Sequence, residues 1–146
     1  MSNTLLHQHG EEFMQDLVIS SGKTFDITLY NDSTDSLGDT SDVGDITTEP
    51  AGASYSRQGD AASGFTASLS GGDVQISGTT VTFDVSDSSQ TVDSVAVIVN
   101  FASDLVSSDG GTGTDHLFYT NALDQDYDLG QFDSAIDLDP TKLTIN

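Results

Sequence analysis

The chain of 146 residues has no cysteine, no tryptophan and only three cationic side chains, Lys23, Arg57 and Lys142. Without cysteine it has no disulfide framework and no thiolate metal site. Three cations are too few for a basic stripe along a phosphate backbone, which argues against nucleic acid as a partner. No run approaches the roughly 20 apolar residues of a membrane span. The N-terminal segment also lacks the basic and apolar regions of a signal peptide. We therefore expect no membrane insertion and synthesis in the cytoplasm.

Acidic side chains dominate what is present. Asp and Glu number 24, of which 21 are Asp, and the formal net charge is −21. In dilute salt such a charge pushes a compact state apart, whereas in molar salt the Debye length falls to about 3 Å and the repulsion is screened. The alternative, an acidic disordered chain, fits poorly with 35% hydrophobic residues, seven Phe and four Tyr. This composition is typical of folded proteins from halophilic archaea and their viruses.

The N-terminal 22 residues differ in pattern from the rest. A short helix is predicted there from helical spacing of four apolar residues: Phe13, Met14, Leu17 and Val18. Two Glu lie in its first turn, where the helix dipole favours them, and Gly22 would end it. We therefore divide the chain into an N-terminal arm and short helix (1–22) and a β-sandwich domain (23–146).

From Lys23 onward the hydrophobic period changes to two, which indicates strands. The candidate strands are 24–30, 46–49, 54–57, 65–69, 74–76, 81–85, 92–101, 116–120, 135–138 and 143–145. Of these, 92–101 is apolar on both faces and is expected to be central, and the turns between 65 and 85 suggest a hairpin or β-meander. The predicted fold class is mainly β, an antiparallel β-sandwich of jelly-roll or immunoglobulin-like type with a short N-terminal helix.

Signals for catalysis are weak. The chain has no G-x-S-x-G motif and three histidines, His7, His9 and His116. His7 and His9 precede the predicted helix, and zinc bound there would need further ligands that the neighbouring sequence does not supply. Carboxylate pairs carry no specificity in a chain with so many Asp. We therefore expect a protein that is not an enzyme.

The segment 124–130 raises the question of calcium or magnesium. Asp124, Asp126 and Asp128 alternate and are followed by Gly130. An EF-hand needs Gly at its sixth position and Glu at its twelfth, and here Gly is seventh and Ala135 is twelfth. We favour a solvated acidic surface, with a Ca²⁺ or Mg²⁺ site at these three residues as the open alternative. No cofactor is expected beyond such weakly bound Mg²⁺, Ca²⁺, Na⁺ or K⁺.

Three segments carry a resemblance to a known family. The first is Asn3-Thr4-Leu5-Leu6 with Gly10-Glu11-Glu12-Phe13 and Leu17, and the second is the strand Ile27-Thr28-Leu29-Tyr30-Asn31-Asp32-Ser33-Thr34-Asp35. The third is Ile46-Thr47-Thr48-Glu49-Pro50-Ala51-Gly52-Ala53-Ser54-Tyr55-Ser56-Arg57. The chain resembles small β-rich virion structural proteins of tailed viruses, in which a "GEE" helix, an "LYND" strand and a "TEPSGAGYAR" segment recur in this order. The later Thr82-Phe83-Asp84 and Val99-Asn100-Phe101 strands are similar as well. The motifs are structural, and no catalytic residues accompany them.

The resemblance implies a capsid-decoration, turret or fibre-base protein, and the composition points to a haloarchaeal tailed virus. Such a protein would be located in the virion. Its expected partners are copies of itself, the major capsid protein or other virion proteins, and host surface glycans. The candidate assembly contacts are Phe13, Met14, Leu17, Val18, Tyr55 and Arg57.

For Arg57 the alternatives are an ion pair between subunits and a local role in tying down its own loop. The alternative functions are a tail or baseplate adaptor, or receptor-binding module, and a carbohydrate-binding module.

Overall fold

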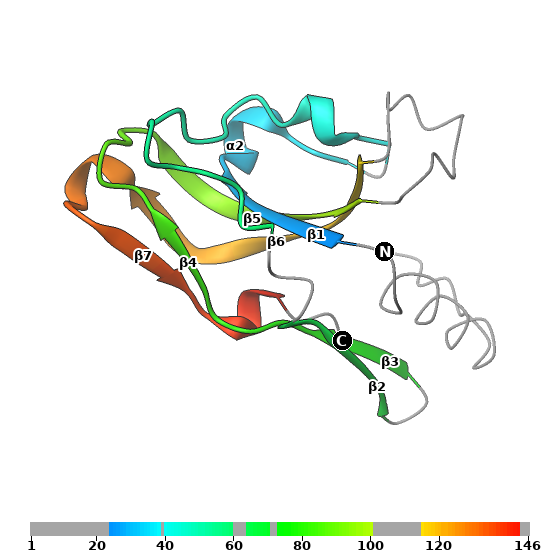
Figure 1. The fold of residues 1–146 in the computed structure, drawn as a ribbon. Helices are drawn as coiled ribbons and strands as arrows, with labels where there is room; N and C mark the ends of the chain where they lie inside the picture. The colour runs from blue at the N-terminus through cyan, green and yellow to red at the C-terminus, as the bar shows by residue number, and fades with distance from the viewer. Residues whose placement is uncertain (1–23, 39, 60–63, 71–72, 101–114, 144–146) are drawn as a thin grey trace.

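The computed structural model describes residues 24–38, 40–59, 64–70, 73–100 and 115–143 (Figure 1). The strands are β1 (Thr24–Tyr30), β2 (Thr66–Ser70), β3 (Asp73–Ser77), β4 (Val81–Asp84), β5 (Thr91–Asn100), β6 (Asp115–Asp128) and β7 (Ala135–Leu138). The helical segments are α2 (Asp32–Asp35) and the 3₁₀ turns η1 (Val43–Asp45), η3 (Leu129–Gln131) and η4 (Pro140–Leu143). The predicted N-terminal helix, with Phe13, Met14, Leu17 and Val18, lies outside the described residues.

One layer is a three-stranded antiparallel sheet in the order β1-β5-β6. Strand β5 is central, as predicted, and Val95, Val97 and Val99 face the main core. Its alternate residues Ala96 and Ile98 face a second, smaller core, so both faces of the strand are covered. This explains why the sequence of β5 is a nearly continuous apolar run rather than an alternating one.

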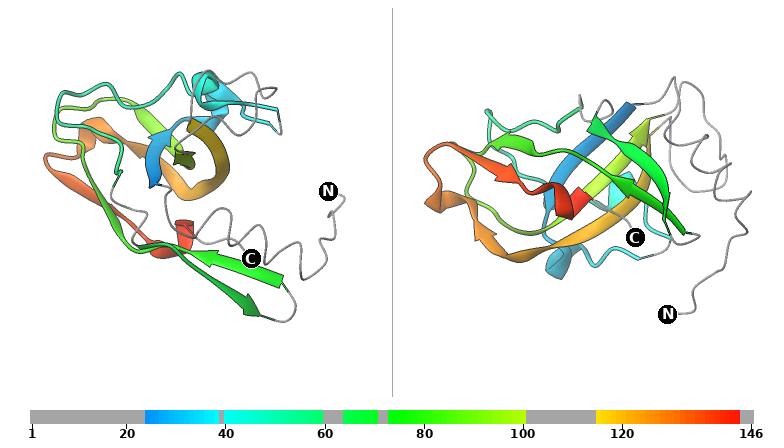
Figure 2. Two further views of the ribbon diagram at one scale, coloured as in Figure 1. Left: turned by 45° about the vertical axis from the view of Figure 1, so that its right-hand side comes forward. Right: turned by 90° about the horizontal axis from the view of Figure 1, so that it is seen from below.

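The other layer consists of two short antiparallel pairs, β4–β7 and β2–β3, which cross the three-stranded sheet (Figure 2). Phe83 and Val85, together with Leu138, bring the β4–β7 side into the main core. Every strand pair is antiparallel. The predicted mainly β, antiparallel fold is therefore confirmed. The predicted β-meander is wrong beyond its first hairpin, because β4 pairs with β7 from the end of the chain rather than with β3.

The smaller core lies on the other face of the three-stranded sheet, under the loop that follows β1. Tyr30, Ile46, Ala96 and Ile98 are buried there. Leu37 and Val43, from the loop, pack over them, as does Leu117 from β6. Residues 31–38 and 40–45 therefore contain two short helical turns, α2 and η1, and apolar side chains that close one side of the sheet.

The C-terminal third departs from the prediction in two places. Strand β6 extends to Asp128, well beyond the predicted strand 116–120, so the acidic segment 124–130 is strand followed by the η3 turn. Leu143, expected to begin a strand, ends the η4 turn, and its backbone carbonyl accepts a hydrogen bond of 3.0 Å from the Tyr119 hydroxyl. Leu143 is fully buried, so packing of one side chain decides the local structure here. No helix in the described part of the chain is long and apolar enough to cross a membrane.

Candidate functional site

The outer edge of β1 is covered by residues 47–58, which we call the edge loop. In the sheet, β1 pairs with β5 on one side only. Without a cover, the backbone groups on its other side could pair with another chain. Three alternate N–H groups on this side have partners in the edge loop. Ile27 N donates to Gln58 O (3.3 Å), and Leu29 N donates to the Tyr55 hydroxyl (2.9 Å). The third, Asn31 N, donates to Thr48 Oγ1 (2.7 Å).

The edge loop is held by an ion pair between its own ends. Arg57 Nε donates to both carboxylate oxygens of Glu49, at 2.8 and 3.1 Å, and Arg57 Nη2 donates to Oε2 at 2.7 Å. The two side chains are 30% and 24% exposed, so salt screens this pair less than a fully exposed one. The structure thus shows the local, loop-tying role for Arg57. A role of Tyr55 and Arg57 in assembly contacts remains a prediction.

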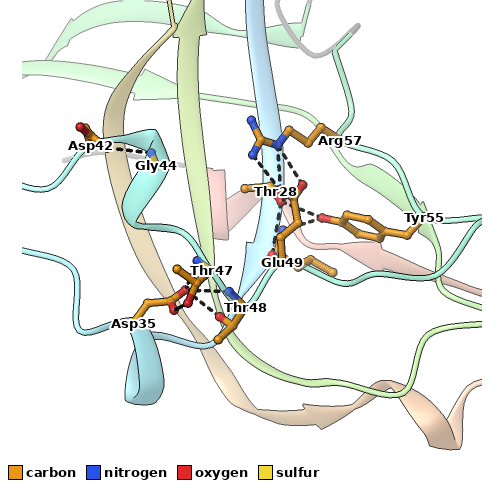
Figure 3. Close-up of polar contacts among 10 residues, drawn as sticks. Thr28, Asp35, Asp42, Gly44, Thr47, Thr48, Glu49, Tyr55 and Arg57 are labelled. Atoms are coloured by element: carbon orange, nitrogen blue, oxygen red, sulfur yellow. Dashed lines mark hydrogen bonds and ion pairs between the residues drawn. The ribbon is translucent and has the colours of Figure 1, made fainter. Parts of the chain in front are cut away.

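A directional hydrogen-bond chain joins the ion pair to β1 (Figure 3). The Thr28 hydroxyl donates to Glu49 Oε1 (2.7 Å) and lies 2.8 Å from the Tyr55 hydroxyl. Since Thr28 has a single hydroxyl proton and gives it to Glu49, Tyr55 must be the donor toward Thr28. The Tyr55 oxygen is then free to accept from Leu29 N. Each polar group in the chain therefore uses its capacity without conflict.

Electrostatics in the chain follow from burial and these bonds. Burial raises the pKa of Tyr55 to about 12, so its proton stays available for Thr28. Burial alone would also raise the pKa of Glu49, but hydrogen bonds from Arg57 and Thr28 outweigh it and lower that pKa below its ordinary value. For Asp26, burial and repulsion from Asp115 outweigh the attraction of Arg57 and raise its pKa. Of these two carboxylates, Glu49 is thus the one whose ionised form the native state stabilises.

The edge loop is also fixed to the core and to a neighbouring turn. The Tyr55 ring stacks on buried Phe83, with ring centroids 5.7 Å apart and an interplanar angle of 9°. A Cβ at Gly52 would lie 2.3 Å from Asp87 Oδ1 and 2.6 Å from Ser88 Oγ. Asp87 in turn accepts from the backbone N–H of Ser54 through both carboxylate oxygens. The glycine is needed because the loop backbone approaches this turn too closely for any side chain.

Several loop aspartates fold the chain rather than only solvate it. Asp35 accepts four hydrogen bonds from the N–H and hydroxyl groups of Thr47 and Thr48 (Figure 3). Asp93 accepts from the N–H groups of Asp32 (2.6 Å) and Ser33 (3.1 Å), which begin α2. For Asp35 and Asp93, burial opposes ionisation, but these donors lower the pKa of each. Asp35 and Asp93 therefore hold loop backbone in place as well as adding to the acidic surface.

The same use of carboxylates recurs at the turns. Asp42 accepts from Gly44 N (2.7 Å), and Asp45 accepts from Asp42 N (3.0 Å), which makes a capping box around η1. Sequence reasoning missed these roles, although Asn and Asp before short polar stretches are a known signal for helix caps. The spacing of Glu49 and the single Arg57 was a comparable signal for the ion pair.

The three aspartates predicted as a metal site lie near the end of β6. Asp124 accepts from the Tyr127 hydroxyl (2.9 Å), and Asp128 accepts from Gly130 N (3.1 Å). Across the described ranges, no group of three or more His, Cys, Asp or Glu side chains could hold a metal ion. The Ca²⁺ or Mg²⁺ site therefore remains a prediction that this geometry does not favour.

Asp124 instead lines a groove of about 470 Å³ together with Asp137, Asp139 and Leu29.

Comparisons with known protein families, with curated proteins and with solved structures found no match to this chain. The site that the geometry defines is the edge loop. Its side-chain hydrogen bonds and its ion pair cover the outer edge of β1.

The hydroxyl of Tyr55 can be tested by Tyr55→Phe. The change leaves Leu29 N without its acceptor and Thr28 without its donor, and we expect a loss of about 1–3 kcal/mol in the free energy of unfolding. Chemical denaturation in molar KCl measures it. Tyr127→Phe is the matched control, because it also loses one hydroxyl hydrogen bond, to Asp124, but at an exposed site. Equal losses in the two variants would contradict the proposed importance of the edge loop.

Acid should weaken the fold through the carboxylates whose pKa is lowered. Because Asp35, Glu49 and Asp93 are favoured as anions in the native state, their contribution is fully present above the unfolded-state pKa, about 4. It is lost as the pH falls through their lower native-state pKa. We expect Asp35→Asn to be less stable than wild type at neutral pH, with the gap closing below pH about 4. Urea midpoints at fixed KCl measure this, with Asp126→Asn as the control. A gap that does not change with pH would show that the ionised form of Asp35 is not what matters.

Proposed function

We propose that the protein is a non-enzymatic structural component of the virion of a haloarchaeal tailed virus, where copies form a symmetric oligomer on the capsid as a decoration or turret component. One observation carries the proposal: two of the described segments that resemble the virion family, 27–35 and 46–57, meet in space at the β1 edge. Leu29 N bonds Tyr55, and Asn31 N bonds Thr48. Contact between these residues at one sheet edge supports a scaffold role for the matching segments.

Surface charge supports the proposed environment. A net charge of −21 is compatible with a compact state only where salt screens the repulsion between the charges. The contacts that hold the edge loop are short, partly buried hydrogen bonds, which keep their strength in molar salt better than long-range attractions do. A protein in high-salt particles needs this combination of screened repulsion and local, charge-assisted bonds.

Closure of the β1 edge supports a role in assembly at high local concentration. Open sheet edges pair with one another without discrimination, and proteins avoid this by covering the edge or placing charge there. In a capsid, many copies of one chain are held close together, so an uncontrolled edge would compete with the symmetric contacts. The edge loop removes the N–H groups of Ile27 and Leu29 from that competition.

The salt requirement can be tested with two double variants that each remove two negative charges. Asp126→Asn with Asp133→Asn changes exposed carboxylates, and we expect folding at a lower KCl concentration than wild type because repulsion falls. Asp35→Asn with Asp93→Asn relieves the same charge but loses the loop hydrogen bonds, and we expect a higher KCl requirement. Circular dichroism over a KCl titration measures both. If the wild-type fold were unchanged in desalted buffer, the environment proposed here would be wrong.

Membership of the particle is the direct test of the function. We expect quantitative mass spectrometry of purified haloarchaeal virus particles to detect this chain at a fixed ratio to the major capsid protein. Hundreds of copies indicate decoration, tens indicate turrets at vertices, and a handful indicates the alternative of a tail or baseplate adaptor. Particles repurified on a second density gradient control for adsorbed protein. Absence from the repurified particles would overturn the proposal.

A further inference from the structure

The stretch 61–83 is poor in charge compared with the rest of the chain. It carries a single charged side chain, Asp73, and every other acid and cation lies outside it. Copies that each carry −21 repel one another least where their surfaces hold fewest charges, because like charges placed against each other are costly. Within this stretch the structure describes the β2–β3 hairpin and β4.

The hairpin is a separate two-stranded sheet. Strands β2 and β3 pair in continuous register from Thr66↔Ser77 to Ser70↔Asp73, and neither pairs with any other strand in the described part of the chain. Figure 1 shows it extending away from the crossing of the two layers. A two-stranded hairpin alone is marginally stable in water, so further pairing would stabilise it.

Its base, in contrast, is firmly attached. The Phe65 ring stacks on Phe25 with centroids 4.7 Å apart. A Cβ at Gly64 would lie 2.3 Å from Thr79 Oγ1, and one at Gly78 would lie 2.8 Å from Leu143 Cβ. These close approaches fix where the hairpin leaves the core. Its strands are therefore presented in a defined direction.

Strand β2 lacks the features by which proteins usually protect an edge. It contains no charged residue and no proline, and its pairing with β3 has no bulge. Thr66 and Ser68 are exposed. Strand β3 differs, because it carries Asp73 and packs against η4 at its base. The β1 edge differs more, since the edge loop covers it. The exposed edge of β2 is thus the one suited to a second copy.

We infer that β2 pairs antiparallel with β2 of a second copy about a two-fold axis near Ser68, which joins two hairpins into one four-stranded sheet. The pairing is self-complementary and closed, as two-fold contacts are. Ser68 then lies opposite Ser68 of the second copy, with uncharged residues on both strands. This inference rests on the proposed function only for its choice of a second copy as the partner.

Cysteine crosslinking tests the pairing, because the chain has no cysteine of its own. Directly opposed residues of an antiparallel pair have Cβ atoms about 4.5–5.5 Å apart, close to the separation that a disulfide spans. In molar KCl under mild oxidation, we expect most molecules of full-length Ser68→Cys to form a disulfide-linked dimer. Ala122→Cys is the matched control, since Ala122 is exposed on β6, the outer strand of the other sheet. It should remain mostly monomeric on a non-reducing gel.

A second variant measures the contact without a crosslink. Ser68→Lys places two like charges opposite each other. At the lowest KCl concentration that keeps the wild type folded, we expect the dimer dissociation constant from light scattering to rise about two- to fivefold. Ala122→Lys makes the same change in net charge and should leave it unaltered. A monomeric wild type, or crosslinking at Ala122 in place of Ser68, would overturn the inference. If Ser68→Cys crosslinks while the chain is absent from particles, the inference stands and the proposed function fails.

Discussion

The structure depends on how the outer edge of β1 is closed. A sheet normally closes an edge with another strand, whereas here the partners of three successive outward N–H groups are a backbone carbonyl, a phenol and a threonine hydroxyl. The phenol of Tyr55 is held by Thr28, Thr28 by Glu49, and Glu49 by Arg57. The only arginine of the chain is therefore used to fix one partly buried hydrogen-bond chain, and its loss would leave the Glu49 carboxylate without its ion-pair partner.

Acidic side chains have two separate roles in this molecule. Those of Asp35 and Asp93 accept hydrogen bonds from backbone N–H groups, and this replaces the cations that the chain lacks as partners for its anions. Others, such as Asp126 and Asp133, are exposed and add repulsion that only salt removes. The acidic composition thus lowers stability in dilute buffer, although the carboxylates of Asp35 and Asp93 hold the loops together. Brine relieves the first effect and leaves the second nearly intact, because short hydrogen bonds are screened little.

The distribution of charge also separates the two kinds of edge. The edge of β1 lies beside Asp26, Glu49 and Arg57 and is covered from within the chain. Strand β2 has no charge and is left uncovered in the described structure. This asymmetry is what the proposed assembly would require, because one edge is then closed from within the chain and the other is left for a second copy.

Composition and periodicity were sufficient for the class of fold. The change from a helical period to a period of two predicted strands, and the two-faced apolar run at 92–101 predicted the central strand, because burial on both faces leaves no room for polar alternation. The resemblance pointed to Tyr55 and Arg57 by local pattern. None of these signals gave the partners of either residue, since Glu49 and Thr28 meet them only after the loop folds onto β1.

Pairing of distant segments was decided by the tertiary structure alone. Strand β4 pairs with β7, more than 50 residues later, and Leu143 is buried in a 3₁₀ turn rather than a strand. The same holds for the carboxylates of Asp35 and Asp93, whose donors lie 12 and about 60 residues away. The sequence determines which side chains must be buried and which groups need hydrogen-bond partners. Which partner each receives depends on how segments far apart in the sequence pack against one another, and no local pattern contains this property of the folded chain.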